Sequence, residues 1–242
     1  MNIEMYRLFS SVQQRHWWFV ARRKIVVDMI ARHFQTPDDS RVLDIGCGAG
    51  LMLNALGQFG ETSGMDNADA AIVLSREIFG GSVRAGQLPD QIPYDAASFN
   101  LITALDVIEH IDDDVESLRA IRSRLVPGGM AIITVPAFMF LWTEFDDINQ
   151  HKRRYTRAEL EAKLRQAGFA IDRISYFNTL LFPVALFVRT LNRLFNRSGA
   201  RDLELPNRHV NAALTRIFGI ESSLLRYLSF PFGVSLIAVV RR

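Results

Sequence analysis

Strand-like and helix-like segments alternate along residues 41–135. Short runs at 41–45, 62–65, 82–85, 98–105 and 130–135 predict strands, and the stretches 51–59, 68–79 and 112–125 predict helices. Right-handed crossovers between such strands build a parallel sheet with helices on both faces. The alternation therefore predicts an α/β fold whose ligands bind at the carboxyl ends of the strands.

The flanking regions extend this sheet. Residues 19–34 place Ala21, Ile25, Met29 and Phe34 on one helical stripe, opposite Arg22, Arg23 and Arg32. Further strands are predicted at 169–177 and 233–240. We therefore expect a single domain, 1–242, made of an N-terminal helical cap (1–40), a cofactor-binding core (41–177), a helical insertion (178–232) and a last strand (233–242).

Composition narrows the class of protein. With 242 residues and 49% hydrophobic content the chain suits one large α/β domain, and a net charge of +2 gives no reason to expect nucleic acid as a partner. The single cysteine, Cys47, excludes an internal disulfide and a metal–thiolate cluster, and we expect no metal site. A cytoplasmic location fits, because no signal-peptide core or run of about 20 apolar residues is present.

A glycine-rich turn follows the first predicted strand. The run from Val42 to Gly50 contains Gly46, Gly48 and Gly50, which let the backbone turn sharply and approach a ligand closely. The spacing is G-x-G-x-G, whereas dinucleotide-binding loops have G-x-G-x-x-G, and Asp44 stands just before the first glycine. These departures favour a ligand without a pyrophosphate.

This loop resembles the first motif of class I S-adenosylmethionine-dependent methyltransferases. The segment from Ser98 to Leu105, the Glu109-His110 pair and the Leu-x-Pro-Gly-Gly turn at 125–129 also resemble that family, although Asn100 replaces its usual Asp. The resemblance is to small-molecule, quinone-modifying and lipid-modifying members. It implies a Rossmann-like, doubly wound, mostly parallel seven-stranded sheet with an antiparallel C-terminal strand. It also implies S-adenosyl-L-methionine as cofactor and S-adenosyl-L-homocysteine as product.

The cofactor-binding candidates follow from the resemblance and from strand ends. Asp66, at the end of the second strand, is expected to accept hydrogen bonds from the ribose hydroxyls, and its alternative role is to cap the next helix. Gln87 or Asp90 would receive the adenine amine. The full set of candidates is Asp44, Gly46, Cys47, Gly48, Gly50, Asp66, Asn67, Gln87, Leu88, Leu105 and Asp106.

Aromatic and histidine residues supply the candidates for acceptor chemistry. The substrate or lid candidates are His16, Trp17, Trp18, Arg22, Trp142 and Tyr155, because aromatic rings attract a sulfonium cation. For His16, Trp17 and Trp18 the alternative is an anchor in the core. His151 is the first candidate for a general base and His110 the second. Asp112, Asp113 and Asp114 are expected to cap a helix and not to bind metal.

The insertion combines apolar and basic residues. An apolar run, Leu180 to Val188, precedes Arg189, Arg193, Arg197 and Arg201, and seven Arg against three acids give residues 178–232 a charge of +4. This pattern predicts peripheral contact with an anionic membrane at its inner, cytoplasmic face, or else a buried cap helix.

Methyl transfer to a small, apolar or lipid-linked acceptor is the function this sequence favours. The alternatives are a nicotinamide-dependent oxidoreductase, although no Tyr-x-x-x-Lys pair is evident, and a non-catalytic S-adenosylmethionine-binding regulator. The sequence leaves open the acceptor atom and the oligomeric state.

Overall fold

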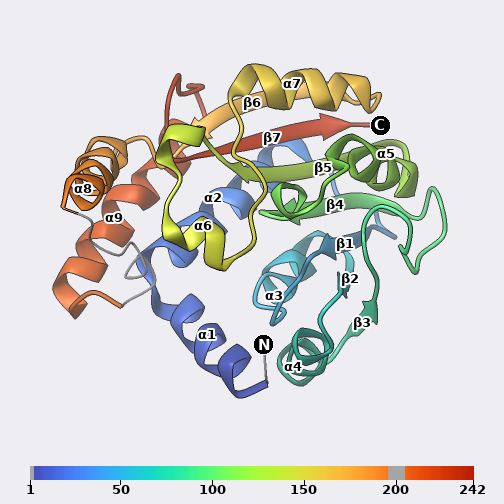
Figure 1. The fold of residues 1–242 in the computed structure, drawn as a ribbon. Helices are drawn as coiled ribbons and strands as arrows, with labels where there is room; N and C mark the ends of the chain where they lie inside the picture. Colours follow the sequence, from blue (N-terminus) through green and yellow to red (C-terminus); the bar gives the residue numbers. More distant parts are fainter. Residues whose placement is uncertain (1–2, 196–204) are drawn as a thin grey trace.

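A seven-stranded sheet runs through the middle of the protein (Figure 1), whose computed structural model describes residues 3–195 and 205–242. The strands are β1 (Arg41–Ile45), β2 (Glu61–Asp66), β3 (Ser82–Ala85), β4 (Phe99–Leu105), β5 (Leu125–Pro136), β6 (Ala170–Phe177) and β7 (Ser235–Arg241). Their order is β3-β2-β1-β4-β5-β7-β6, and β7 is antiparallel to both of its neighbours. The predicted mostly parallel sheet with an antiparallel C-terminal strand is confirmed.

Helices cover both faces of this sheet. They are α1 (Ile3–Arg15), α2 (Trp17–His33), α3 (Leu53–Leu56), α4 (Asp69–Phe79), α5 (Asp114–Arg124), α6 (Glu144–Ile148), α7 (Arg157–Gln166), α8 (Phe182–Leu194) and α9 (Arg208–Leu224), with 3-10 turns η1 (Gly57–Phe59), η2 (Ile108–His110) and η3 (Met139–Leu141). On one face α5 and α7 pack in the core, and on the other α2 and α9 do (Figure 1).

Successive residues of the central strands point to opposite faces. Val42 packs with α2 and α9, whereas its neighbour Leu43 packs in the cluster that contains α5 and α7. In β5, Ile132 likewise packs with α2 and α9, and its neighbour Ile133 packs in the cluster that contains α5 and α7. Both faces are therefore buried, which explains why these strands are continuous apolar runs in the sequence.

Several helix ends are as the sequence predicts. The Asp113 side chain caps α5 by accepting a hydrogen bond of 3.2 Å from the backbone N–H of Glu116. Thr156 and Glu159 form a capping box at the start of α7, and Gly168, at φ +87°, follows its end. The capping role is thus confirmed for Asp113.

Other boundaries differ from the prediction. The helix expected at 51–59 is only the short α3 followed by the turn η1, and Trp17 and Trp18 form the first turn of α2 instead of preceding it. In the insertion, Pro183 lies in the first turn of α8, where its missing N–H would have no helical partner. The described residues of the insertion include two helices, α8 and α9.

Candidate active site

The glycine loop lies at the carboxyl end of β1. Gly46, Gly48 and Gly50 all have positive φ, at 69°, 54° and 78°. A Cβ added to Gly46 would lie 2.6 Å from a Val107 methyl, and one added to Gly50 would lie 3.0 Å from the Ser75 Cβ. A Cβ on Gly48 would meet nothing within 4 Å. Packing thus requires Gly46 and Gly50, whereas Gly48 faces open space where a ligand can approach the backbone.

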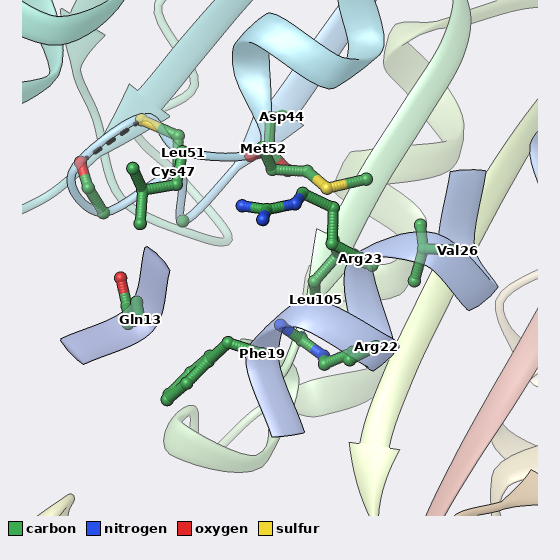
Figure 2. A pocket seen from close by; sticks show the side chains of 12 residues that line it. Gln13, Phe19, Arg22, Arg23, Val26, Asp44, Cys47, Leu51, Met52 and Leu105 are labelled. Atoms are coloured by element: carbon green, nitrogen blue, oxygen red, sulfur yellow. Dashed lines mark hydrogen bonds between the residues drawn. The ribbon is translucent and has the colours of Figure 1, made fainter. Parts of the chain in front are cut away.

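A cavity of about 140 Å³ adjoins this loop (Figure 2). Its walls include Gln13 of α1, Phe19 and Arg23 of α2, Cys47 and Gly48 of the loop, and Leu105 at the end of β4. The cavity therefore lies between the carboxyl ends of β1 and β4 and the two N-terminal helices, as expected for a doubly wound sheet.

Asp44 places a carboxyl group beneath the cavity. The side chain is 3% exposed and accepts a hydrogen bond of 2.6 Å from the Thr103 hydroxyl. Burial raises its pKa to about 7, while the Thr103 hydrogen bond and the charge of Arg22 oppose the rise and the charge of Asp66 adds to it. A cationic ligand group in the cavity would favour the ionised carboxylate.

Arg23 brings the opposite charge to the same cavity. Figure 2 shows its guanidinium pointing into the cavity from α2. None of the hydrogen bonds or ion pairs between described residues engages this side chain. The helical pattern placed Arg23 on the polar stripe of its helix but gave it no role. Its position next to the glycine loop could not be read from that pattern.

Asp66 holds the glycine loop to the start of α4. One carboxylate oxygen accepts a hydrogen bond of 2.8 Å from the Gly48 N–H, and the other accepts one of 3.0 Å from the Ala68 N–H. The N-cap position of α4 is Ala68, so Asp66 bonds the residue before the helix proper. Each oxygen keeps a second lone pair, so a ribose hydroxyl can still donate to this carboxylate.

The predicted adenine residues lie around a different recess. Gln87, Leu88 and Asp90 line a space of about 630 Å³ together with residues 111–113 at the start of α5. Leu88 is buried, whereas Gln87 and Asn67 are exposed. The adenine assignment stays a prediction.

Asp106 forms a closed network with Arg22. The Asp106 carboxylate lies 2.6 Å from the Arg22 guanidinium. It also accepts a hydrogen bond of 3.0 Å from the Thr134 hydroxyl, and Arg22 donates a hydrogen bond of 3.1 Å to the same hydroxyl. The guanidinium also lies 5.0 Å from the ring centroid of Trp18. These contacts tie α2 to the ends of β4 and β5 and leave Arg22 and Asp106 paired with each other.

The aromatic cluster before the first strand divides between core and cavity. His16 is 2% exposed, and its Nδ1 accepts a hydrogen bond from the Trp18 N–H at the start of α2. Trp17 packs edge-on against Phe218 of α9 at 5.9 Å between ring centroids. His16 and Trp17 thus fit the alternative role of core anchors, and Phe19 is the aromatic residue of this cluster that lines the cavity.

The other two lid candidates also lie away from the cavity walls. Tyr155 is 1% exposed and donates a hydrogen bond of 2.8 Å to Asp114. Trp142 donates one of 3.0 Å from its indole nitrogen to Asp147. The expectation that Tyr155 contacts a substrate conflicts with this burial, because its hydroxyl is already held in the core.

The two base candidates come together in space. His110 ends η2, His151 follows α6, and their ring centroids are 4.6 Å apart. The His151 Nδ1 lies 2.8 Å from Asp146. Burial, and then the neighbouring His151, lower the pKa of His110, which therefore stays neutral near pH 7.

Comparison with known proteins adds relatives to this geometry. A family described as a methyltransferase domain matches residues 18–174. The chain is 28% identical over 158 residues to the ubiquinone biosynthesis O-methyltransferase of Xanthomonas axonopodis pv. citri, covering 57% of this chain and 66% of that protein. It is 30% identical over 138 residues to the protein of that name from Idiomarina loihiensis, covering 50% of this chain and 55% of that protein. The chain thus spans about half to two thirds of the length of these relatives.

Solved structures share the fold at low identity. The phosphoethanolamine N-methyltransferase 2 of Haemonchus contortus, in complex with S-adenosyl-L-methionine, matches with a TM-score of 0.59 and 17% identity, over 91% of this chain and 52% of that chain. The cyclase SpnF matches with a TM-score of 0.56 and 19% identity, over 90% of this chain and 81% of that chain. These likenesses establish the fold alone, and none of the comparisons supports the nicotinamide-dependent or regulatory alternatives.

Because the methyltransferase-domain match covers most of the chain and includes the glycine loop, Asp66 and the Glu109-His110 pair, the chain belongs to the S-adenosylmethionine-dependent methyltransferase family and has S-adenosylmethionine as its cofactor.

Proposed function

We propose that this protein transfers the methyl group of S-adenosylmethionine to an oxygen of a small, apolar, lipid-linked acceptor. The observation that carries the proposal is the pair of opposite charges, Asp44 and Arg23, at one cavity beside the open Gly48. Asp44 suits the ammonium group of the cofactor and Arg23 its carboxylate. Asp66, with lone pairs to spare, suits the ribose hydroxyls.

The residues of the chain have mainly a positioning role. The bound cofactor supplies a methyl group that its sulfonium already activates. Asp44, Arg23 and Asp66 fix the orientation of the cofactor, and α1 and α2 cover the cavity through Gln13 and Phe19. Alignment of two reactants in a site from which water is excluded lowers the barrier without an obligatory acid or base.

An aromatic cluster suits an apolar acceptor. Phe138 follows β5 and stacks on Phe140 and Tyr176, with ring centroids 5.0 and 4.9 Å apart. Phe182 and Phe232 extend the cluster from α8 and from the loop before β7. All five residues lie near the carboxyl ends of β5 and β6. The cofactor cavity lies at the same end of the parallel strands. The relatives named as ubiquinone biosynthesis O-methyltransferases support an oxygen acceptor of this apolar kind.

The exposed side of α8 suits a membrane surface. Val184, Phe187 and Val188 lie on one side of this helix and are 57%, 64% and 44% exposed. We call these three residues the α8 apolar face. None of the helices in the described part of the chain is long and apolar enough to span a bilayer. An interfacial helix gains binding energy from such a face, so we place the acceptor at the cytoplasmic surface of a membrane.

The predicted arginine row carries less of this proposal than expected. Arg189 donates a hydrogen bond of 2.6 Å to the Leu141 backbone oxygen, so its guanidinium is directed at the protein instead of at lipid. The side chain of Arg193, and all of Arg197 and Arg201, lie outside the described residues. The apolar face is therefore the feature to test.

Cofactor binding is tested by calorimetry with S-adenosylhomocysteine, S-adenosylmethionine and NAD. We expect the first two to bind and NAD not to bind. Methyl transfer from labelled S-adenosylmethionine to a lipid extract then separates an enzyme from a cofactor-binding regulator. Cofactor binding without any transfer to lipid, aromatic or metabolite acceptors would contradict the enzymatic role.

Membrane contact is tested by sedimentation with anionic and neutral vesicles at low and high salt. Changing Val184 and Phe187 to Ser should release the protein into the supernatant. Val73→Ser is the matched control, because Val73 is 44% exposed on α4, a different helix. Equal recovery of the wild type in the supernatant under all conditions would remove the membrane from the proposal and leave the methyl transfer in place.

A further inference from the structure

Three potential metal ligands meet beyond the carboxyl end of β4. Glu109 and His110 come from η2, which follows β4, and His151 comes from the loop between α6 and α7. One ligand atom from each residue lies within 4.8 Å of the other two. The sequence predicted no metal site and treated the two histidines as separate base candidates, because nothing in their spacing shows that they meet.

Glu109 has an unsatisfied carboxylate. The residue is 0% exposed, and neither carboxylate oxygen has a hydrogen-bond partner. The two nearby acids are different, because Asp106 pairs with Arg22 and Asp146 pairs with Arg154. Among the described residues, Glu109 is thus the acid of this region that lacks a cation. An unpaired buried carboxylate is costly, and a bound cation removes that cost.

Asp146 fixes the orientation of His151. Its carboxylate lies 2.8 Å from the His151 Nδ1 and is itself held by two hydrogen bonds from Arg154, of 2.9 and 2.8 Å. Because Arg154 pairs with this carboxylate, the carboxylate is positioned to accept a hydrogen bond from the His151 Nδ1–H. The Nε2 atom of His151 is then the unprotonated nitrogen. A carboxylate behind a histidine is the usual support of a metal-ligating imidazole.

We propose that Glu109, His110 and His151 bind one divalent first-row transition-metal ion, of which Zn²⁺ is the best fit. Two imidazoles and one carboxylate suit Zn²⁺ better than Mg²⁺, which prefers oxygen ligands. Three protein ligands leave at least one coordination position for an outside oxygen. If the proposed methyl transfer is correct, the acceptor hydroxyl occupies that position. The ion would then hold that oxygen in place and ease loss of its proton to water.

The test is metal titration of the chelator-stripped full chain. We expect calorimetry to give one equivalent of Zn²⁺, visible absorption to show one equivalent of Co²⁺ in a nitrogen–oxygen site, and Mg²⁺ at equal concentration not to compete. Glu109→Gln and His151→Asn should each weaken Zn²⁺ binding by more than about 100-fold, the upper range for loss of an outer-shell partner. His209→Gln is the matched control, because His209 is an exposed histidine on α9.

Two outcomes overturn the site. Stoichiometric Zn²⁺ binding that neither Glu109→Gln nor His151→Asn weakens places the ion elsewhere. No Zn²⁺ or Co²⁺ binding by the folded wild type means that Glu109 is satisfied by a proton instead. If Glu109→Gln does not fold, His151→Asn decides, because His151 is partly exposed and lies in a loop.

The outcome is separate from that of the proposed function. S-adenosylhomocysteine is titrated into the same metal-free and Zn²⁺-loaded samples. Binding of S-adenosylhomocysteine without Zn²⁺ binding refutes only the metal site. Zn²⁺ binding without binding of either adenosyl ligand refutes only the proposed function.

Discussion

Replacing Asp44 by Asn tests the charge balance of the cofactor cavity. In the folded protein the pKa of Asp44 is raised to about 7 from an ordinary value of 3.8, because the carboxyl is buried. A raised carboxyl pKa means that the folded state binds this proton more tightly than the unfolded state does. The contribution of Asp44 to the free energy of unfolding is therefore most favourable below pH 4 and is lost as the pH rises through 7. The Asp44→Asn variant has an amide that cannot ionise at this position, so it would lack this dependence.

The magnitude follows from the two pKa values. The full shift corresponds to about 4 kcal/mol at a pH well above 7, at 1.36 kcal/mol per unit. Between pH 5 and pH 8 the wild type should lose about 3 kcal/mol of stability relative to Asp44→Asn. The variant should thus be the more stable protein at pH 8. It should bind the cofactor more weakly, by about 1.5–3 kcal/mol, because it has lost the charged partner of the ammonium group.

The assay is urea denaturation of both proteins at pH 5 and pH 8 without cofactor, followed by calorimetry with S-adenosylhomocysteine. Asp39→Asn is the control, since Asp39 is an exposed acid in the turn before β1. In the wild type, S-adenosylhomocysteine affinity should also fall as the pH drops below 7, when Asp44 becomes protonated. An equal pH dependence of stability in wild type and Asp44→Asn would refute the reasoning.

The remaining cofactor predictions use the same calorimetry. Asp66→Ala should weaken S-adenosylhomocysteine binding by about 1.5–3 kcal/mol, and unchanged affinity would place the ribose elsewhere. Gly48→Val should abolish binding. Both variants strain a backbone of positive φ, but Gly46→Val should lower the urea midpoint further, because its side chain also meets Val107. A bound cofactor in folded Gly48→Val would contradict the site. Arg23→Gln should weaken S-adenosylhomocysteine by about 1.5–3 kcal/mol but leave 5′-methylthioadenosine, which has no carboxylate, unaffected; equal losses for both ligands would rule out the carboxylate contact.

The sheet was predictable because its signals are local. Val42 and Leu43 are both apolar because both faces of β1 are buried, and the glycines that follow are needed within a few residues of the strand end. Asp44 and Asp66 could be singled out for the same reason, since each stands at the end of a strand. These two cofactor-binding candidates could be proposed from the sequence because their positions depend on nearby chain geometry.

Long-range pairing was not predictable. Nothing in the sequence joins Arg22 to Asp106 or His110 to His151, because these pairs depend on how α2 and the loop after α6 lie against the strand ends. Residue type also does not reveal burial. Tyr155 looked like a substrate contact and is in the core.

The insertion shows the same limit. Arg189 looked like part of a basic row directed at lipid, yet it bonds the backbone at Leu141. The apolar run beside it was visible in the sequence. Which of its residues are exposed depends on the packing of α8 in the folded protein.

The place of β7 inside the sheet has a consequence for how the chain is made. β6 lies at the sheet edge, and its strand partner among the described residues is β7, which also pairs with β5. Because β7 is the last strand in the chain, α8 and α9 are synthesised before β7 can pair with β5 and β6. Until then, the strand edges that pair with β7 are open. Open strand edges of this kind recruit other chains. Slow packing of the insertion should consequently reduce the yield of soluble protein even when every residue of the active site is intact.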